Sequence, residues 1–180
     1  IAANNYAGLG SIFSVVRYGN VMNSRGSVIP IFLNMKNKKY LSITDARMTR
    51  FNITLGEGVN FVLQCFREAK GGEIFVPKLK SYKITDLAKA ISLKAKIKII
   101  GKRPGEKIDE EMITSADSIN SLEFKNYFII FASNKNKLFS FYKKKKNGKA
   151  LPLNFSYNSR NNAFLSIKEI KDLIKKSVYA

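Results

Sequence analysis

Short apolar runs alternate with amphipathic segments along this chain, and that alternation constrains its fold more than any other feature. Four runs have the length and the β-branched or aromatic content of buried strands: residues 12–16, 73–76, 97–100 and 126–131. Two shorter strand candidates lie at 41–44 and 50–53. Strands that alternate with helices predict an α/β protein.

Helix signals stand between these runs. Thr54 and Glu57 form a T-x-x-E capping box. Gly71-Gly72 marks the end of the helix that follows. This helix has an apolar stripe at i, i+3, i+4 and i+7, which we expect to face the core: Val59, Val62, Leu63 and Phe66.

Three more segments have helical character. Ser27 is the expected N-cap of a helix over 27–35, with Pro30 in its first turn. Ile84, Leu87, Ala88 and Ile91 share one face of the next helix. A second capping box over 166–169 opens a helix with four inward positions: Ile167, Ile170, Leu173 and Ile174.

Composition limits the possible classes. The chain has 180 residues, 45% of them hydrophobic, enough for one domain with a core. No apolar run approaches the ~20 residues of a membrane span, so we expect no membrane association. The start at Ile1 lacks the features of a signal peptide, and we expect a fragment of a longer cytoplasmic protein.

Residue types also limit the chemistry. The chain has no histidine, which excludes imidazole base catalysis and most transition-metal sites, and we expect no metal. The single cysteine, Cys65, is expected to be a small buried residue in a reducing compartment.

The formal net charge of +19 raises nucleic-acid binding as a hypothesis. The densest cluster, Lys143–Lys146 with Lys149, lies in the polar segment 133–149, which we expect to be a mobile loop. The other lysines are scattered, and no aromatic residues interleave with them in a nucleic-acid motif. Specific nucleic-acid binding is therefore the lesser alternative.

The stretch from Arg103 to Lys107 follows one of the apolar runs. Pro104 and Gly105 predict a defined turn that presents Arg103 and Glu106. Arginine suits a bidentate grip on phosphate, and a neighbouring carboxylate can orient it or bind a sugar hydroxyl. The alternative is a surface turn with a local ion pair.

A second polar cluster closes the first strand. Asn20 follows Arg17, Tyr18 and Gly19 at the carboxyl end of that strand, where ligands bind in open α/β sheets. Arg25 and its flanking serines precede the helix at 27, so the turn is either an anion site or an ordinary capped loop.

The segment 44–51 places Arg47 and Arg50 near Asp45, either as a salt-bridged loop or as part of a site. The pattern Gly8-x-Gly10 precedes a strand instead of following one, and we reject it as a dinucleotide-binding loop.

These motifs occur together and in order: residues 13–20 (FSVVRYGN), 24–28 (SRGSV), 44–51 (TDARMTRF), 71–77 (GGEIFVP), 85–89 (TDLAK) and 99–107 (IIGKRPGEK). The ordered set resembles the carboxyl-terminal part of inverting UDP-N-acetylglucosamine 4,6-dehydratases. These are extended short-chain dehydrogenase/reductases of polysaccharide biosynthesis that start pseudaminic acid synthesis. The likeness weakens over 133–149.

The resemblance implies the carboxyl-terminal part of a Rossmann-type fold with its substrate-binding subdomain. It implies three segments: the end of the Rossmann core plus the sugar-nucleotide subdomain over 1–132, the loop over 133–149, and a carboxyl-terminal segment with a helix over 150–180. It also implies NADP as cofactor, UDP-N-acetylglucosamine as substrate and a homo-oligomer at full length. The family oxidises the sugar at C4, eliminates water across C5 and C6, and returns hydride to C6.

The resemblance carries over site residues as well. Substrate contacts fall on Asn20, Val21, Ser24, Arg25, Arg50, Arg103, Pro104, Gly105 and Glu106. Tyr18 is expected beside the nicotinamide. The glycine-rich loop and the catalytic Tyr-x-x-x-Lys pair belong upstream of Ile1, so no catalytic residue is expected in this chain, which should be inactive alone.

The sequence departs from the family pattern at several positions. Asn23 replaces a usual glycine, which strains that turn if its φ is positive. Asn52 replaces an aromatic residue, Gly56 an aspartate and Asp109 a histidine. A related dehydratase or epimerase acting on the same sugar nucleotide, as in fucosamine synthesis, remains an alternative.

Overall fold

The structure is a computed structural model that describes residue 10 and residues 12–135 and 137–178. Its contacts divide the chain into two compact units that interleave along the sequence. Unit 1 comprises residues up to Tyr18, Gly58–Lys78 and Glu111–Tyr157, and unit 2 comprises Gly19–Glu57, Leu79–Glu110 and the rest from Asn158. These boundaries differ from those expected at 132 and 150.

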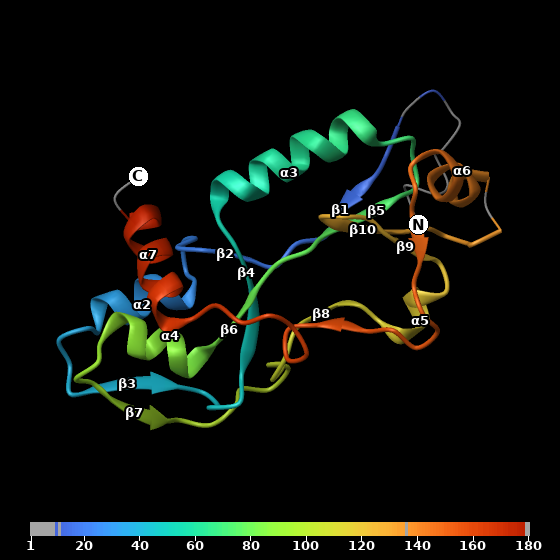
Figure 1. Ribbon diagram of the computed structural model, residues 1–180. Helices are drawn as coiled ribbons and strands as arrows, with labels where there is room; N and C mark the ends of the chain where they lie inside the picture. The colour runs from blue at the N-terminus through green and yellow to red at the C-terminus, as the bar shows by residue number, and fades with distance from the viewer. Residues whose placement is uncertain (1–9, 11, 136, 179–180) are drawn as a thin grey trace. The chain divides into compact units, whose positions relative to one another are not determined.

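Unit 1 is built on a five-stranded sheet in the order β1-β5-β10-β9-β11. Strand β1 (Val15–Val16) runs parallel to β5 (Ile74–Pro77), whereas β10 (Tyr127–Ile130), β9 (Ser121–Glu123) and β11 (Lys149–Ala150) continue antiparallel. The unit also holds β8 (Glu111–Ile113) and α5 (Ser115–Ser118). Figure 1 shows β1 at one edge of the sheet.

Two helices complete the core of unit 1. Helix α3 (Leu55–Glu68) packs Phe61 and Cys65 against Phe75 of β5, and helix α6 (Lys137–Lys145) adds Phe139 and Tyr142. The expectation of a loop over 133–149 is therefore wrong for residues 137–145. Two aromatic side chains three positions apart anchor this helix, while the lysines of its last turn stay exposed near the negative end of the helix dipole.

The prediction for the core face of α3 is also wrong. The capping box at Thr54 is present, with the Glu57 carboxylate accepting from the Thr54 N–H at 2.8 Å. The helix, however, buries Gly58, Phe61 and Cys65 and leaves the predicted stripe exposed. A sequence with apolar residues on two sides of one helix does not reveal which side meets the core.

Unit 2 contains two small sheets. Strand β2 (Asn20–Val21) pairs parallel with β4 (Thr49–Ile53), which pairs antiparallel with β6 (Ser81–Lys83). Strands β3 (Tyr40–Ile43) and β7 (Lys96–Ile99) form a parallel pair. Strand β12 (Tyr157–Asn158) lies at the boundary between the units.

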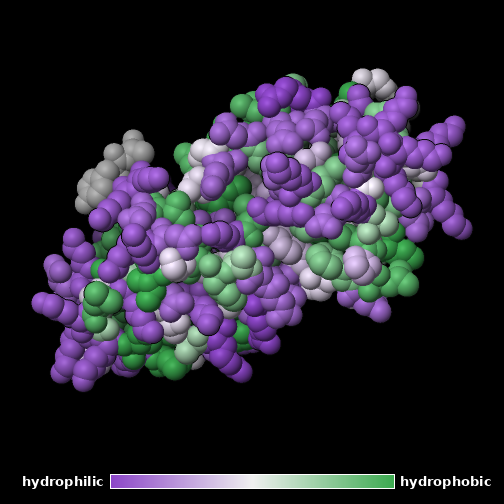
Figure 2. Space-filling model, in the orientation of Figure 1, coloured by the Kyte–Doolittle hydropathy of each residue, from purple (hydrophilic) through white to green (hydrophobic). Residues whose placement is uncertain are grey.

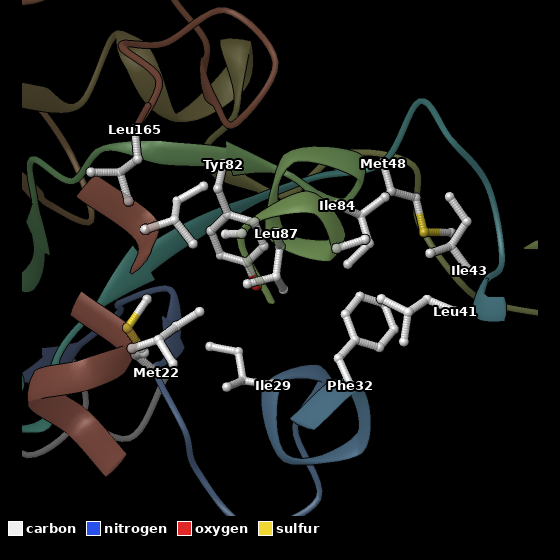
Figure 3. Packing of buried hydrophobic residues seen from close by; sticks show 14 residues of the cluster. Met22, Ile29, Phe32, Leu41, Ile43, Met48, Tyr82, Ile84, Leu87 and Leu165 are labelled. Atoms are coloured by element: carbon white, nitrogen blue, oxygen red, sulfur yellow. The ribbon is translucent and has the colours of Figure 1, made fainter. Parts of the chain in front are cut away.

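Helices α2 (Val28–Asn34), α4 (Ile84–Ile91) and α7 (Ile167–Val178) surround the core of unit 2. Figure 3 shows its side chains converging between the helices, with Tyr82 and Leu87 in the middle. The expected inward faces of α4 and α7 are confirmed, as is the capping box at Ser166, where Glu169 accepts from the Ser166 N–H at 2.8 Å.

The mixed α/β class is confirmed, but two expected buried strands are not buried. Ile12 and Val15 at the start of unit 1 are largely exposed, and so are Ile99 and Ile100 at the end of β7. On the face drawn in Figure 2, hydrophilic side chains predominate, with apolar patches among them.

Candidate functional site

A cleft of about 530 Å³ in unit 2 brings together residues from separate sequence motifs. Its polar lining comes from strands β2, β3, β4 and β6 and from the loops that follow β2, β3 and β7: Asn20, Ser24, Ser27, Ser42, Thr44, Arg50, Tyr82, Arg103 and Glu106. Its apolar wall includes Phe32, Met48 and Ile84, which Figure 3 shows between α2 and the start of α4. A polar rim over an apolar wall suits a ligand with both kinds of surface.

The predicted turn at 103–106 is confirmed. The Glu106 N–H donates to the Arg103 carbonyl at 3.1 Å, and Gly105 has φ +77°, the pattern of a type II turn with proline second and glycine third. The Glu106 carboxylate accepts from the Arg103 N–H and from the Thr44 hydroxyl, each at 3.1 Å. These bonds orient Glu106 and leave the Arg103 guanidinium, among the described residues, without a hydrogen bond or an ion pair.

Arg50 has a different environment. Its Nη1 donates to the carbonyls of Thr49 and Ile108 at 2.7 and 2.9 Å, and its Nη2 donates to the Lys107 carbonyl at 2.9 Å. Its Nε lies 3.8 Å from Glu110 Oε1. Most of the guanidinium is therefore engaged in holding the backbone that follows the 103–106 turn.

Asn20 and Tyr82 line the same cleft, Asn20 with an exposed side chain and Tyr82 with a buried one. Burial, and then the nearby Glu110 carboxylate, raise the pKa of Tyr82 to about 12, while the Asn20 amide acts in the opposite direction. Burial also raises the pKa of Glu110, although the Phe51 N–H donates to its carboxylate at 2.9 Å. The Tyr82 hydroxyl in the cleft is thus neutral at physiological pH.

Two consecutive turns carry the chain from β2 to α2. The Ser24 N–H donates to the Val21 carbonyl and the Ser27 N–H to the Ser24 carbonyl. Asn23 has φ +61°, so the replacement of glycine does put an L-residue in the left-handed region. Its amide donates to the Ser177 carbonyl at 3.0 Å, which ties this turn to α7 and offsets part of the strain.

Ser27 occupies the N-cap position of α2 as expected, but its hydroxyl caps no N–H. The Ser27 Oγ atom is buried at the cleft and has no hydrogen-bond partner in the described part of the chain. Helix α2 has 7 residues, and the expectation of an anion site in the turn before it stays a prediction.

Five of the expected substrate residues line the cleft: Asn20, Ser24, Arg50, Arg103 and Glu106. The other four, Val21, Arg25, Pro104 and Gly105, lie in the adjoining strand and turns without lining it. Sequence reasoning missed Tyr82 as a cleft group, because it stands in no motif that signals a ligand. It placed Ser27 in the turn before α2 but did not foresee that its hydroxyl would lie free at the cleft.

Arg17 and Tyr18, which shortly precede Asn20 in the sequence, belong to unit 1. Arg17 donates to the Met112 carbonyl at 2.8 Å and lies 3.8 Å from Asp117, so its charge is used within that unit. Tyr18, the expected cofactor residue, is 41% exposed.

Arg47 pairs with Asp45 at 2.7 Å and holds the pKa of that carboxyl at about 2. Arg47 is therefore the salt-bridged loop residue that the sequence offered as the alternative to a site residue.

Catalytic and metal groups are not assembled in the described part of the chain. No cluster of metal-ligating side chains occurs among those residues. Tyr142 and Lys146 have the Tyr-x-x-x-Lys spacing, but the Tyr142 hydroxyl is buried and bonds the Glu73 carboxylate and the Glu68 carbonyl. None of the described helices has the length and apolar character needed to cross a membrane.

Comparison with known proteins supports the resemblance drawn from the motifs. The chain is 48% identical, over 97% of its length, to the inverting UDP-N-acetylglucosamine 4,6-dehydratase of Campylobacter jejuni, and spans 54% of that protein. It is 38% identical, over 91% of its length, to the UDP-glucose 4-epimerase of Rickettsia canadensis, and spans 49% of it. The chain thus covers about half the length of these relatives.

A solved structure and a family model agree with these relatives. The X-ray structure of Pen from Bacillus thuringiensis superposes with a TM-score of 0.81 at 33% identity, over 99% of this chain and 55% of that one. The model of the family described as polysaccharide biosynthesis protein matches residues 1–132. The chain is a member of this polysaccharide biosynthesis protein family.

Proposed function

We propose that the unit 2 cleft binds UDP-N-acetylglucosamine and that the chain is the sugar-nucleotide-binding portion of an inverting 4,6-dehydratase. The observation that carries the proposal is the convergence of Asn20, Arg103 and Glu106, from motifs far apart in the sequence, on one cleft. The higher identity to the dehydratase than to the epimerase favours dehydration over epimerisation.

Each cleft residue has a role that follows from its contacts. Arg103, with its unpaired guanidinium on a rigid turn, grips the diphosphate. The turn holds Glu106 in place, and its carboxylate accepts from hydroxyl and amide groups. Asn20 can both donate to and accept from such groups. Arg50 acts as a positioning residue that fixes the backbone behind Arg103, since its own donors are largely engaged.

The described residues do not form a dinucleotide cradle. No turn among them that joins a strand to a helix carries the G-x-G-x-x-G pattern needed for close approach to a pyrophosphate. The proposal that NADP serves the reaction therefore rests on the resemblance, and Tyr18 is the one residue of this chain assigned to it. Since the Tyr142 hydroxyl of the Tyr-x-x-x-Lys spacing is buried and bonded to Glu73 and Glu68, the chain alone should have no dehydratase activity.

The same resemblance extends the proposal to cellular context. It assigns the reaction to pseudaminic acid synthesis in the cytoplasm and the full-length protein to a homo-oligomer. An open reading frame upstream of Ile1 that encodes a glycine-rich loop and Tyr-x-x-x-Lys would support this assignment.

Calorimetric titration with UDP-N-acetylglucosamine tests the proposal. Arg103→Ala should weaken binding roughly 10- to 100-fold, because it removes charge-assisted hydrogen bonds to phosphate. Arg47→Ala is the matched control, since Arg47 is an exposed arginine paired with Asp45 outside the cleft lining. Equal affinities for the two variants, or no binding by the unaltered chain at millimolar ligand, would refute the assignment.

Nucleic-acid binding is the second candidate, and the +19 charge favours it. Titration with duplex DNA at increasing salt separates the two. Salt-sensitive DNA binding that Arg50→Ala and Arg103→Ala leave unchanged, together with no response to the sugar nucleotide, would favour this candidate.

A further inference from the structure

A second hollow in unit 2 is lined by lysines and shares no lining residue with the cleft. Its volume is about 720 Å³, within the roughly 300–1,000 Å³ of small-molecule sites. Three segments far apart in the sequence form it: the turn from α2 to β3, the end of α4 with the turn to β7, and helix α7. We call it the basic hollow, after the five lysines that line it: Lys36, Lys38, Lys39, Lys94 and Lys171.

The backbone that carries these lysines is fixed by hydrogen bonds and packing. Strands β3 and β7 pair in parallel, so the turns that enter them lie at the same end, as Figure 1 shows. The Lys96 N–H donates to the Lys39 carbonyl and the Lys38 N–H to the Met35 carbonyl, each at 2.9 Å. Helix α7 packs against α4, which places Lys171 beside these turns. The fold of unit 2, and not a run in the sequence, therefore gathers the lysines.

The positive charge of the basic hollow is unbalanced in the part of the chain that the structure describes. Its described lining contains no aspartate or glutamate, and none of the five lysines forms an ion pair with another described residue. Asp86 of α4 and Asp172 of α7 are near lining residues in the sequence but do not line the hollow. Because like charges repel one another, the hollow attracts an anion that carries several charges.

Apolar side chains form part of the same surface. Leu93 is 73% exposed in the turn after α4, and Ile91 and Ala95 are partly buried beside it in the lining. A smaller hollow of about 240 Å³ adjoins the basic hollow and adds Lys175, one turn of α7 after Lys171. Ammonium groups around an apolar patch suit phosphates, either alone or attached to an organic group.

We propose that the basic hollow binds a small molecule with two or more linked phosphates. Lysine binds phosphate as a point charge, so several lysines suit an anion whose charge is spread along a chain. A lone phosphate would engage only the lysines nearest to it and leave the others unbalanced. A hollow of this volume admits a small molecule, whereas a nucleic-acid duplex requires a continuous basic surface. The proposal does not depend on the function proposed for the cleft, since the two sites share no residue.

Calorimetric titration of the 180-residue chain with inorganic tripolyphosphate tests the site. Tripolyphosphate should bind roughly tenfold or more tightly than inorganic phosphate at equal ionic strength, and added salt should weaken the binding. Adenosine triphosphate is the second arm. Higher affinity for it than for tripolyphosphate assigns the site to a nucleotide, and equal or lower affinity assigns it to an inorganic phosphate chain. Tripolyphosphate that binds no more tightly than inorganic phosphate would reflect only the net charge of +19 and overturn the proposal.

Paired lysine substitutions locate the bound anion. Lys94→Gln with Lys171→Gln should weaken tripolyphosphate binding roughly tenfold or more, because two charged donors are lost. Lys89→Gln with Lys168→Gln is the matched control, since it removes the same charge from α4 and α7 outside both hollows. If a lowered melting temperature shows that the first pair disturbs folding, Lys38→Gln with Lys94→Gln confines both changes to exposed turn positions. Equal losses in the hollow and control pairs overturn the proposal.

Two further titrations separate this site from the cleft and from a nucleic-acid surface. Arg103→Ala should leave the lysine-dependent binding of tripolyphosphate unchanged, because Arg103 lines only the cleft. Binding that is lost in Arg103→Ala and kept in Lys94→Gln with Lys171→Gln belongs to the cleft and overturns the proposal. Duplex DNA that binds more tightly than tripolyphosphate and requires the same two lysines also overturns it, in favour of nucleic acid. Failure of the sugar nucleotide to bind contradicts the proposed function alone.

Discussion

Glu73 is the most informative position at which to test the stability of unit 1. Its side chain is fully buried, with 0% exposure, and none of the ion pairs in the described residues includes it. Four donors satisfy the carboxylate instead. Oε1 accepts from the Lys70 N–H at 2.7 Å and the Tyr142 hydroxyl at 3.0 Å, and Oε2 accepts from the Gly71 N–H at 2.8 Å and the Ser14 hydroxyl at 2.6 Å.

The substitution Glu73→Gln should be costly because of this arrangement. Each carboxylate oxygen receives one backbone N–H that cannot turn away. Whichever way the glutamine amide is flipped, its NH₂ group therefore faces a backbone donor. The variant loses one hydrogen bond outright and the charge assistance of the others. With ~1.5–3 kcal/mol for each bond to a charged group, we expect a loss of about 3–5 kcal/mol.

Urea unfolding followed by circular dichroism measures this loss, which should lower the midpoint by about 2 M at a typical slope. Tyr142→Phe keeps the ring in the core and removes one donor, so it should lose about 1–2 kcal/mol. Tyr18→Phe, which removes an exposed hydroxyl, is the control. A Glu73→Gln variant less than 1 kcal/mol below the parent protein would refute the reasoning, since glutamine would then satisfy all the donors.

Three other predictions concern single side chains. Gly19→Ala would place its Cβ 2.4 Å from Phe51 Cβ in the core of unit 2, so we expect a loss of about 2–4 kcal/mol in urea unfolding and weaker sugar-nucleotide binding through the displaced Asn20. Cys65 has its pKa raised to about 12 by burial, so at pH 8 only about one thiol in 10⁴ is ionised; reaction with a disulfide reagent should be slow until guanidinium unfolds the protein, and a fast native reaction would contradict its burial. Tyr82 should ionise near pH 12. Since its folded pKa lies above the unfolded value of 10, its contribution to stability is present below pH 10 and is lost as the pH rises to 12. Tyr82→Phe should remove the corresponding late rise in absorbance at 295 nm.

Local signals in the sequence were sufficient for the turns and helix starts. The capping boxes at Thr54 and Ser166 and the turn at Arg103 depend on residues three apart, and the structure confirms all of them. Such features follow from the chemistry of neighbouring backbone groups, so they need no knowledge of the remainder of the fold.

Contacts between distant residues were not accessible in this way. Arg50 binds carbonyls 57 and 58 positions away, and Tyr142 meets Glu73 across 69 positions. The composition of 133–149 predicted a loop because its lysines outnumber the two aromatic residues that anchor α6. Likewise, periodicity showed that α3 has an apolar stripe but not whether that stripe is covered.

The cleft and the exposed apolar side of α3 belong to different units of this chain. Every residue that lines the cleft belongs to unit 2, which has its own core, so the ligand binding that we propose uses side chains of that unit. The exposed apolar side of α3 belongs to unit 1. The binding that we propose for the cleft therefore depends on unit 2, and we expect the chain to hold a sugar nucleotide unchanged, because the Tyr142 hydroxyl is buried and bonded to Glu73.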